Sequence, residues 1–161
     1  TQRRYHIPKG IYFITTNTAN HVSWFTEDSL CRIVMEHTWM NALAKHFTVF
    51  AFVIMPDHLH LLLQTHGDDI SECMRSLKTN CSREINRHLR SAGVDTRAAK
   101  SNHAAFQWQP RFHDHIIRNT QDFKTHLDYI RNNPVRAGLV EHPEDYPYLY
   151  VAPDEVFKNL F

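Results

Sequence analysis

The stretch Thr48–Thr65, TVFAFVIMPDHLHLLLQT, determines the expected fold because it joins two long apolar segments through a short break. Thr48–Met55 is aromatic and β-branched, and His58–Thr65 has the same strand-like character, so both are predicted to be β-strands. Pro56 and Asp57 interrupt the apolar run. The two segments therefore form either adjacent antiparallel strands or one long strand with a kink at Pro56.

Two histidines open the second segment, in the order His58-Leu59-His60. Residues two apart in a strand point to the same face, so the imidazoles project together while Leu59 faces the other way. Two imidazoles about 7 Å apart can converge on one divalent cation and leave positions for a third ligand, water and a phosphate. The alternative is two ordinary strand histidines, but polar rings on an apolar sheet face need a compensating partner. The spacing favours a metal site.

The segments on either side complete an alternating pattern of strands and helices. We expect strands at 11–18 and 106–117, helices at 27–46 and 70–90, and a third helix that starts at 120 and is ended by Pro134 and Gly138. The order β-α-β-β-α-β-α favours an α+β fold, an antiparallel sheet with helices packed mainly on one face. Residues 1–161 are expected to form a single domain, with a mobile loop at 91–105 and a packed C-terminal tail at 141–161.

Composition excludes some classes of protein. A hydrophobic content of 42% and a charged content of 22% over 161 residues are those of an ordinary globular chain. The longest apolar run is far shorter than the roughly 20 residues of a membrane-spanning helix, so no membrane partner is expected. Three cysteines without a CxxC pair, and the lack of an export signal, favour a cytoplasmic protein. The net charge of +1 does not indicate nucleic-acid binding, although basic residues outnumber acidic ones between positions 75 and 118.

The third helix carries a tyrosine outside its apolar stripe. Leu127 and Ile130 belong to that stripe, whereas Tyr129 lies beside it, one turn before Asn133. If the helix persists to its end, a phenol and an amide oxygen point to one place, and the amide oxygen suits Mg²⁺ or Mn²⁺. Alternatively, Tyr129 covers the edge of the core with its hydroxyl in water. A residue before proline is also biased away from helical geometry, so Pro134 could splay Asn133 outwards.

The segment Trp108–Arg118, WQPRFHDHIIR, mixes aromatic and basic residues. On a strand, one face would carry Arg111, His113 and His115. Aromatic rings interleaved with Arg and His suit single-stranded nucleic acid, through base stacking and phosphate contacts. The alternative is a strand at the edge of the core with a solvated basic face.

Three motifs occur together in the order of a known family. They are P-D-H-L-H at 56–60, W-Q-P-R-F-x-D-H-x-I-R at 108–118 and D-Y-I-x-x-N-P-V-x-x-G-L-V at 128–140. The opening R-R-Y-x-x-P-x-G-x-Y-F-x-T at 3–15 adds to them. Over roughly residues 3–150, the chain resembles the REP-associated tyrosine transposases, relatives of the single-tyrosine HUH transposases of bacterial insertion sequences.

The resemblance implies a ferredoxin-like or RRM-like sheet and a set of site residues. His58 and His60 resemble the two metal-binding histidines, and Tyr129 resembles the catalytic nucleophile. Asn133 falls where relatives place a third polar metal ligand, often a glutamine. The cofactor implied is Mg²⁺ or Mn²⁺, and the chain would be a nucleoid-associated monomer, with a dimer as the alternative.

The resemblance also implies the reaction. The phenol would attack single-stranded DNA near a hairpin, form a 5′-phosphotyrosine and release a 3′-OH, and a 3′-OH would then reverse the step. Candidate DNA contacts are Arg3, Arg4, Arg111, His115 and Arg118. The same motifs allow two other functions to be compared with this one. A histidine-triad hydrolase lacks its nucleophile because Leu62 occupies the third alternating position. A non-catalytic hairpin-binding module on an RRM-like sheet remains the alternative.

Overall fold

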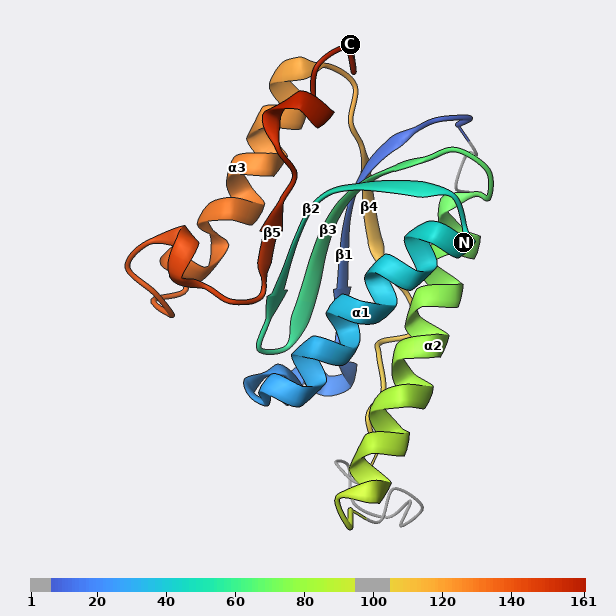
Figure 1. Cartoon of the computed structure of the whole chain (residues 1–161), viewed down its shortest axis with the longest axis vertical. Helices are drawn as coiled ribbons and strands as arrows, with labels where there is room; N and C mark the ends of the chain where they lie inside the picture. Colours follow the sequence, from blue (N-terminus) through green and yellow to red (C-terminus); the bar gives the residue numbers. More distant parts are fainter. Residues whose placement is uncertain (1–6, 95–104) are drawn as a thin grey trace.

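A computed structural model describes residues 7–94 and 105–161 as a five-stranded antiparallel sheet flanked by three long helices (Figure 1). The strands are β1 (Ile11–Asn17), β2 (Phe47–Met55), β3 (His58–Thr65), β4 (His113–Ile116) and β5 (Leu149–Val151). The helices are α1 (Asp28–Ala44), α2 (Ile70–Ser91) and α3 (Thr120–Arg136). Short 3-10 turns lie at Ala19–His21, Trp24–Thr26, Pro143–Asp145 and Asp154–Val156.

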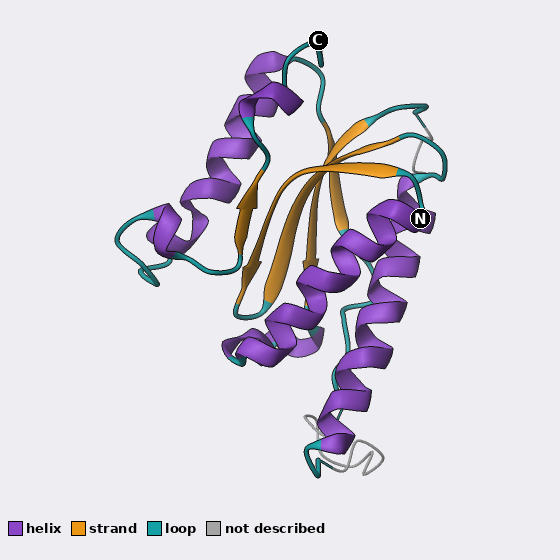
Figure 2. Cartoon of the chain, in the orientation of Figure 1, coloured by secondary structure: helices purple, strands orange, loops and turns teal. Residues whose placement is uncertain are grey.

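The sheet order, β4-β1-β3-β2-β5, is the ferredoxin-like arrangement of the first four strands with β5 added beside β2. Helices α1 and α2 cover one face, and α3 lies on the opposite face (Figures 1 and 2). Two buried clusters separate these layers, one beneath α1 and α2 and the other beneath α3. The predicted α+β class is confirmed, and two of the three long helices share a face.

Strands β2 and β3 form a hairpin, which decides between the two arrangements expected for this stretch. Met55 pairs with His58, so Pro56 and Asp57 are the two residues of the turn. β2 is apolar almost throughout because both of its faces are buried, and an irregularity between Val49 and Ala51 shifts its register. Such a bulge places an additional side chain on one face of the sheet.

Alternation along β3 gives the two faces different chemistry. Leu59 and Leu61 are fully buried beneath α1 and α2, whereas Leu62 belongs to the cluster beneath α3. His58 and His60 therefore share the face on which α3 packs. The neighbouring strand β1 places Thr15 opposite His60 in the pairing register. The predicted common orientation of the two histidines agrees with this arrangement.

Helix α3 continues past the residue that was expected to end it. Pro134 lies within the helix and is buried, and Gly138, with a φ of 71°, follows the helix end. The Leu139 amide donates to the Pro134 carbonyl at 2.9 Å, as in a Schellman ending. The expectation that Pro134 helps to end the helix is therefore wrong, and Asn133 keeps its helical position.

The strand predicted for 106–117 is much shorter, because only His113–Ile116 pair as β4. Pro110 has no amide hydrogen to donate to a ladder. The Lys78 ammonium instead donates to the carbonyl oxygens of Gln109 and Arg111, at 2.6 and 3.1 Å. This part of the chain is held against α2 and makes one isolated bridge with the sheet, from Trp108 to Thr18.

The C-terminal tail contributes β5, which the sequence analysis did not predict. The tail also contacts β2, because the Tyr146 hydroxyl donates to the Ile54 carbonyl at 2.6 Å. Most of the predicted mobile loop, at positions 95–104, lies outside the described residues, as do Arg3 and Arg4. Within the described ranges, every helix is too short or too polar to cross a bilayer.

Candidate functional site

His58, His60 and Tyr129 meet on the face of the sheet covered by α3. The ring centroids of His58 and His60 are 4.7 Å apart, and those of His60 and Tyr129 are 5.2 Å apart. The histidines come from the start of β3 and the tyrosine from the middle of α3, 69 positions further along the chain than His60. The fold therefore brings together the three residues that the sequence singled out.

His60 is a buried, neutral imidazole with one unused nitrogen. Its Nδ1 lies 2.8 Å from the Thr15 hydroxyl, whereas its Nε2 is buried without a hydrogen-bond partner among the described residues. Burial, helped by the nearby His58 ring, lowers the His60 pKa to about 3. When Nδ1 donates to the Thr15 oxygen, Nε2 carries a lone pair. A neutral imidazole with one nitrogen anchored and the other free is the usual form of a metal ligand.

His58 is anchored in the same way through a carboxylate. Its Nδ1 lies 2.6 Å from an oxygen of Asp57, and the other oxygen of that carboxylate lies 3.1 Å from Nδ1 of His21. Burial raises the pKa of Asp57, but the hydrogen bonds and charges of the two imidazoles outweigh it and lower the pKa below its ordinary value. Asp57 therefore stays ionised and fixes the His58 ring, as carboxylates do behind metal-binding histidines.

The Tyr129 side chain is partly exposed, and its ring makes its contacts with the rest of the protein. The side chain is 37% exposed, and its ring contacts the edge of the Phe13 ring at 5.8 Å. The Arg136 guanidinium lies 5.2 Å from the ring centroid, a cation–π distance. Within residues 7–94 and 105–161 the Tyr129 hydroxyl has no hydrogen-bond partner, which leaves it available to a ligand.

Asn133 follows Tyr129 by one turn on the same helix and is half-buried. The orphaned His60 nitrogen and the anchored His58 ring are two neighbouring nitrogen donors that fit a divalent cation. On these residues, the family's metal fits the chain.

A second group with ligand chemistry lies between β4 and α3. Nε2 of His115 is 3.0 and 2.9 Å from the two carboxylate oxygens of Asp122, and Nδ1 of His126 is 3.1 Å from one of them. Their donor atoms lie within 4.8 Å of one another, close enough to hold a metal ion. Asp122 also accepts from the Arg118 amide at 3.0 Å, and its own amide donates to the Asn119 side chain at 2.9 Å. The Asn119 side chain thus caps α3, and the Asp122 carboxylate holds the amide of the residue before that cap.

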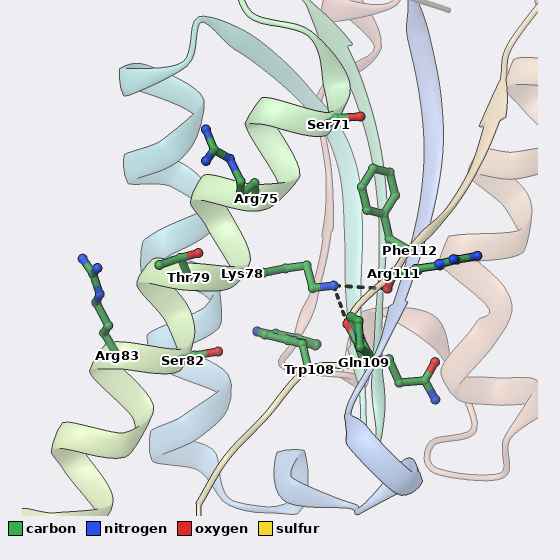
Figure 3. Close-up of a pocket in the computed structure, with 11 residues that line it drawn as sticks. Ser71, Arg75, Lys78, Thr79, Ser82, Arg83, Trp108, Gln109, Arg111 and Phe112 are labelled. Carbon is green, nitrogen blue, oxygen red and sulfur yellow. Dashed lines mark hydrogen bonds between the residues drawn. The ribbon is translucent and has the colours of Figure 1, made fainter. Parts of the chain in front are cut away.

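Three of the candidate DNA contacts lie within the described residues: His115 and Arg118 both bond to Asp122, and Arg111 lies at a separate groove (Figure 3). His115 is held by Asp122 and stacked on His126, at a centroid distance of 4.5 Å. Arg118 lies exposed before α3, and Arg111 lines a groove beside α2. Their roles in DNA binding stay predictions.

Sequence reasoning missed the residues that support the site. Phe13 packs against His60 at 5.3 Å and against His126 at 4.7 Å, so it joins the two histidine groups. Asp57 could have been suspected because it directly precedes His58. Thr15 and Phe13 carried no such signal, because their positions depend on the register between β1 and β3.

The buried neutral state of His60 makes the metal-free fold sensitive to acid. Its folded pKa of about 3 lies below the ordinary histidine pKa of 6.5, so between these values the unfolded chain binds the proton and stability falls as pH falls. Between pH 6 and 4.5, this group alone should cost the wild type about 2 kcal/mol. Urea unfolding in chelator should show that loss in the wild type beyond any loss in His60→Gln. Equal losses in both proteins would contradict a buried neutral His60.

Comparison with known proteins identifies the class. Residues 8–133 match the family model described as "Transposase IS200 like". The chain therefore belongs to the IS200-like transposases, enzymes that cleave and join DNA. Its relatives place it among the REP-associated tyrosine transposases of that family. The REP-associated tyrosine transposase of Escherichia coli K12 is 31% identical over 150 residues, which cover 91% of this chain and 79% of the relative. A Haemophilus influenzae protein named after the same transposases is also 31% identical, over 91% of this chain and 82% of its own length.

Solved structures agree with this assignment. A REP-associated tyrosine transposase bound to a REP hairpin matches with a TM-score of 0.72 and 29% identity, over 100% of this chain and 87% of that chain. A Deinococcus radiodurans protein described as a transposase matches with a TM-score of 0.56 and 19% identity, over 82% of this chain and 96% of that chain. The second likeness shows the fold alone.

Proposed function

We propose that this transposase is a metal-dependent endonuclease and strand transferase that cuts and rejoins single-stranded DNA near hairpin repeats through a 5′-phosphotyrosine on Tyr129. The observation that carries the proposal is the contact between the Tyr129 ring and His60, whose buried Nε2 has no partner among the described residues. A free imidazole nitrogen beside an exposed phenol is the arrangement expected of a nucleophile next to a metal site.

His58 and His60, with Asn133, are the proposed ligands of Mg²⁺ or Mn²⁺. Asp57 and Thr15 hold the Nδ1 atoms of the two imidazoles and leave both Nε2 atoms to bind. When bound, the cation would supply positive charge to a non-bridging oxygen of the scissile phosphate. We favour this set over His115, Asp122 and His126, because in that group the carboxylate oxygens are already engaged by the Arg118 amide and the His115 ring.

The proposed cleavage and joining steps need no reactant other than DNA, the enzyme and water. The Tyr129 oxygen forms a bond to phosphorus as the bond from phosphorus to the 3′ oxygen breaks. The phenol proton leaves to water, and the departing 3′ oxygen becomes a hydroxyl. A 3′-OH then attacks the phosphotyrosine and regenerates the phenol, so joining needs no nucleotide cofactor. The Arg136 guanidinium, which lies over the Tyr129 ring, keeps positive charge close to the attacked phosphate.

The related proteins support a proposal for the binding partner, cellular location and oligomeric state of this chain. The structure bound to a REP hairpin supports hairpin DNA as the partner of this chain. We propose a cytoplasmic, nucleoid-associated protein that consists of one catalytic domain and acts as a monomer. The alternative of a non-catalytic hairpin-binding module is disfavoured because His58, His60 and Tyr129 are all present and in contact.

A covalent-capture assay tests the proposal. The chain is incubated with a labelled oligonucleotide that contains a hairpin and a single-stranded flank, with Mg²⁺, with Mn²⁺ or with chelator, and resolved under denaturing conditions. We expect a labelled protein band and a shortened strand only when metal is present. Tight hairpin binding without any covalent band would contradict the proposal and favour the binding module.

A further inference from the structure

A second set of possible metal ligands lies where β4 runs into α3, beside the proposed catalytic site (Figure 1). Residues 117–119 join the strand to the helix, and His115 on β4 faces the first turns of α3. Asp122 and His126 are one helical turn apart and point to the same side of α3. Two elements of the fold therefore hold these three side chains together.

The donor atoms are spaced almost as a zinc ion would space them. Nε2 of His115 lies 2.9 Å from one Asp122 oxygen, and Nδ1 of His126 lies 3.1 Å from the other. Zinc bonds of about 2.0 to 2.2 Å in a tetrahedron place neighbouring donors about 3.3 to 3.6 Å apart. All three donors lie within 4.8 Å of one another, and the His115 side chain is 45% exposed, so a small rotation of its ring completes the set.

The hydrogen bonds within the group are compatible with a cation. A carboxylate has about four lone-pair sites, so the Arg118 amide, which donates to one Asp122 oxygen at 3.0 Å, leaves sites for an ion. When a cation enters, each imidazole carries its proton on its other ring nitrogen. His126 then gives up the 2.9 Å bond from Nδ1 to the Asp122 carbonyl, which keeps its helical amide partner.

The carboxylate of the group is ionised at neutral pH. Burial raises the pKa of Asp122, but the hydrogen bonds from His115 and from the Arg118 amide outweigh it and lower the pKa below its ordinary value. The side chain is 19% exposed, so its charge is only partly hydrated. A cation at this place would therefore meet a negative charge and two imidazoles.

The donor types select a transition-metal ion rather than Mg²⁺. Two imidazoles and one carboxylate form the protein ligands of several zinc sites. In the general order of divalent metals, such a site binds Zn²⁺ more tightly than Mn²⁺, and Mg²⁺ prefers oxygen ligands. The three cysteines, which would otherwise compete for zinc, are all buried.

We propose that His115, Asp122 and His126 form a second metal site, which binds Zn²⁺ and ties β4 to the start of α3. The site goes beyond the proposed function and does not depend on the cation of the catalytic site. The ion stabilises the folded chain, because the unfolded chain does not hold the three ligands together. Tyr129 follows His126 on the same helix, so the ion also restrains the helix that carries the proposed nucleophile.

Calorimetric titration with Zn²⁺ tests the proposal on the wild type, His58→Ala, His115→Ala and the double variant. We expect two tightly bound ions in the wild type and one in each single variant. In the His58→Ala background, His115→Ala should lower the remaining zinc affinity by at least about 100-fold, because it removes a ligand. Zn²⁺ at about 100 times its Kd should raise the melting temperature of His58→Ala by about 5 to 10 °C. It should not raise that of the double variant.

Nonspecific binding is the main competing explanation, because the chain has 13 histidines. His142→Ala is the matched control, since it removes an exposed imidazole outside the group. It should keep the zinc affinity and stoichiometry of the wild type. His126→Gln, which removes the imidazole on α3, should weaken zinc binding as His115→Ala does, and it keeps the test decisive if one variant unfolds.

Two results would overturn the second site. One is equal zinc binding by His58→Ala and by the double variant, and the other is an equal loss in His142→Ala and His115→Ala. If His58→Ala binds as many ions as the wild type, the proposed catalytic site is wrong. The comparison between His58→Ala and the double variant still decides the second site in that case.

Discussion

Tyr129→Phe should lose the covalent DNA adduct completely and slow strand cleavage by on the order of 10⁴-fold or more, because it removes the attacking oxygen itself. The substitution should affect the chemical step and leave the fold unchanged. The ring contacts with His60 and Phe13 and the position beneath Arg136 need no hydroxyl. Stopped time courses on a labelled hairpin substrate, resolved on denaturing gels, measure both adduct and product.

The phenylalanine variant also provides its own structural control. The Tyr129 side chain is 37% exposed, so replacing its hydroxyl with hydrogen leaves no buried group unsatisfied. Its melting temperature and its affinity for uncut hairpin should match those of the wild type. Cleavage that persists in this variant at the wild-type rate would show that another group is the nucleophile.

His58→Ala should lower Mg²⁺-dependent cleavage by at least about 100-fold. Mutating a residue that only orients a metal ligand typically lowers metal affinity or activity by about 10- to 100-fold, and removing the ligand itself should cost no less. The side chain is 24% exposed, so the variant removes a ligand without opening a large cavity. Asp57→Asn, which weakens the anchor on Nδ1, should lower Mn²⁺ affinity by about 10-fold to 100-fold. Calorimetric titration with Mn²⁺ gives the affinities directly.

The second histidine group supplies the control for the metal experiment. His115→Ala breaks the group of His115, Asp122 and His126 and leaves His58 and Asp57 in place. It should retain Mn²⁺ affinity within about twofold of the wild type. If His115→Ala lost the metal and His58→Ala kept it, the cation would belong between β4 and α3, and the proposed ligand set would be wrong.

The elements that matter for the site were predictable because their signals are local. The hydrophobic run broken at Pro56 and Asp57 gave both strands of the hairpin, and period-two alternation put His58 and His60 on one face. Helical spacing on α3 placed Tyr129 beside the apolar stripe. Each of these features depends only on residues that are neighbours in the sequence, so local patterns were enough to predict it.

The missed features depend on contacts between distant parts of the chain. β5 has only three residues and exists because it pairs with β2, across more than 90 positions. Lys78 binds carbonyl oxygens of 109 and 111 and keeps that segment out of the sheet, which no local propensity reveals. Thr15 supports His60 because of the β1–β3 register, and Pro134 is tolerated because α3 is fixed by the core beneath it.

The identity of the covalently modified residue tests the central claim most directly. Trypsin should release residues 125–131, THLDYIR, between Lys124 and Arg131, and Tyr129 is its single tyrosine. After reaction with a hairpin substrate and nuclease trimming, mass spectrometry should find this peptide carrying a 5′-linked nucleotide phosphate in the Mg²⁺ sample and not in the chelator sample. A nucleotide on a different peptide, such as one containing Tyr12 or Tyr146, would contradict the assignment of Tyr129 as the nucleophile.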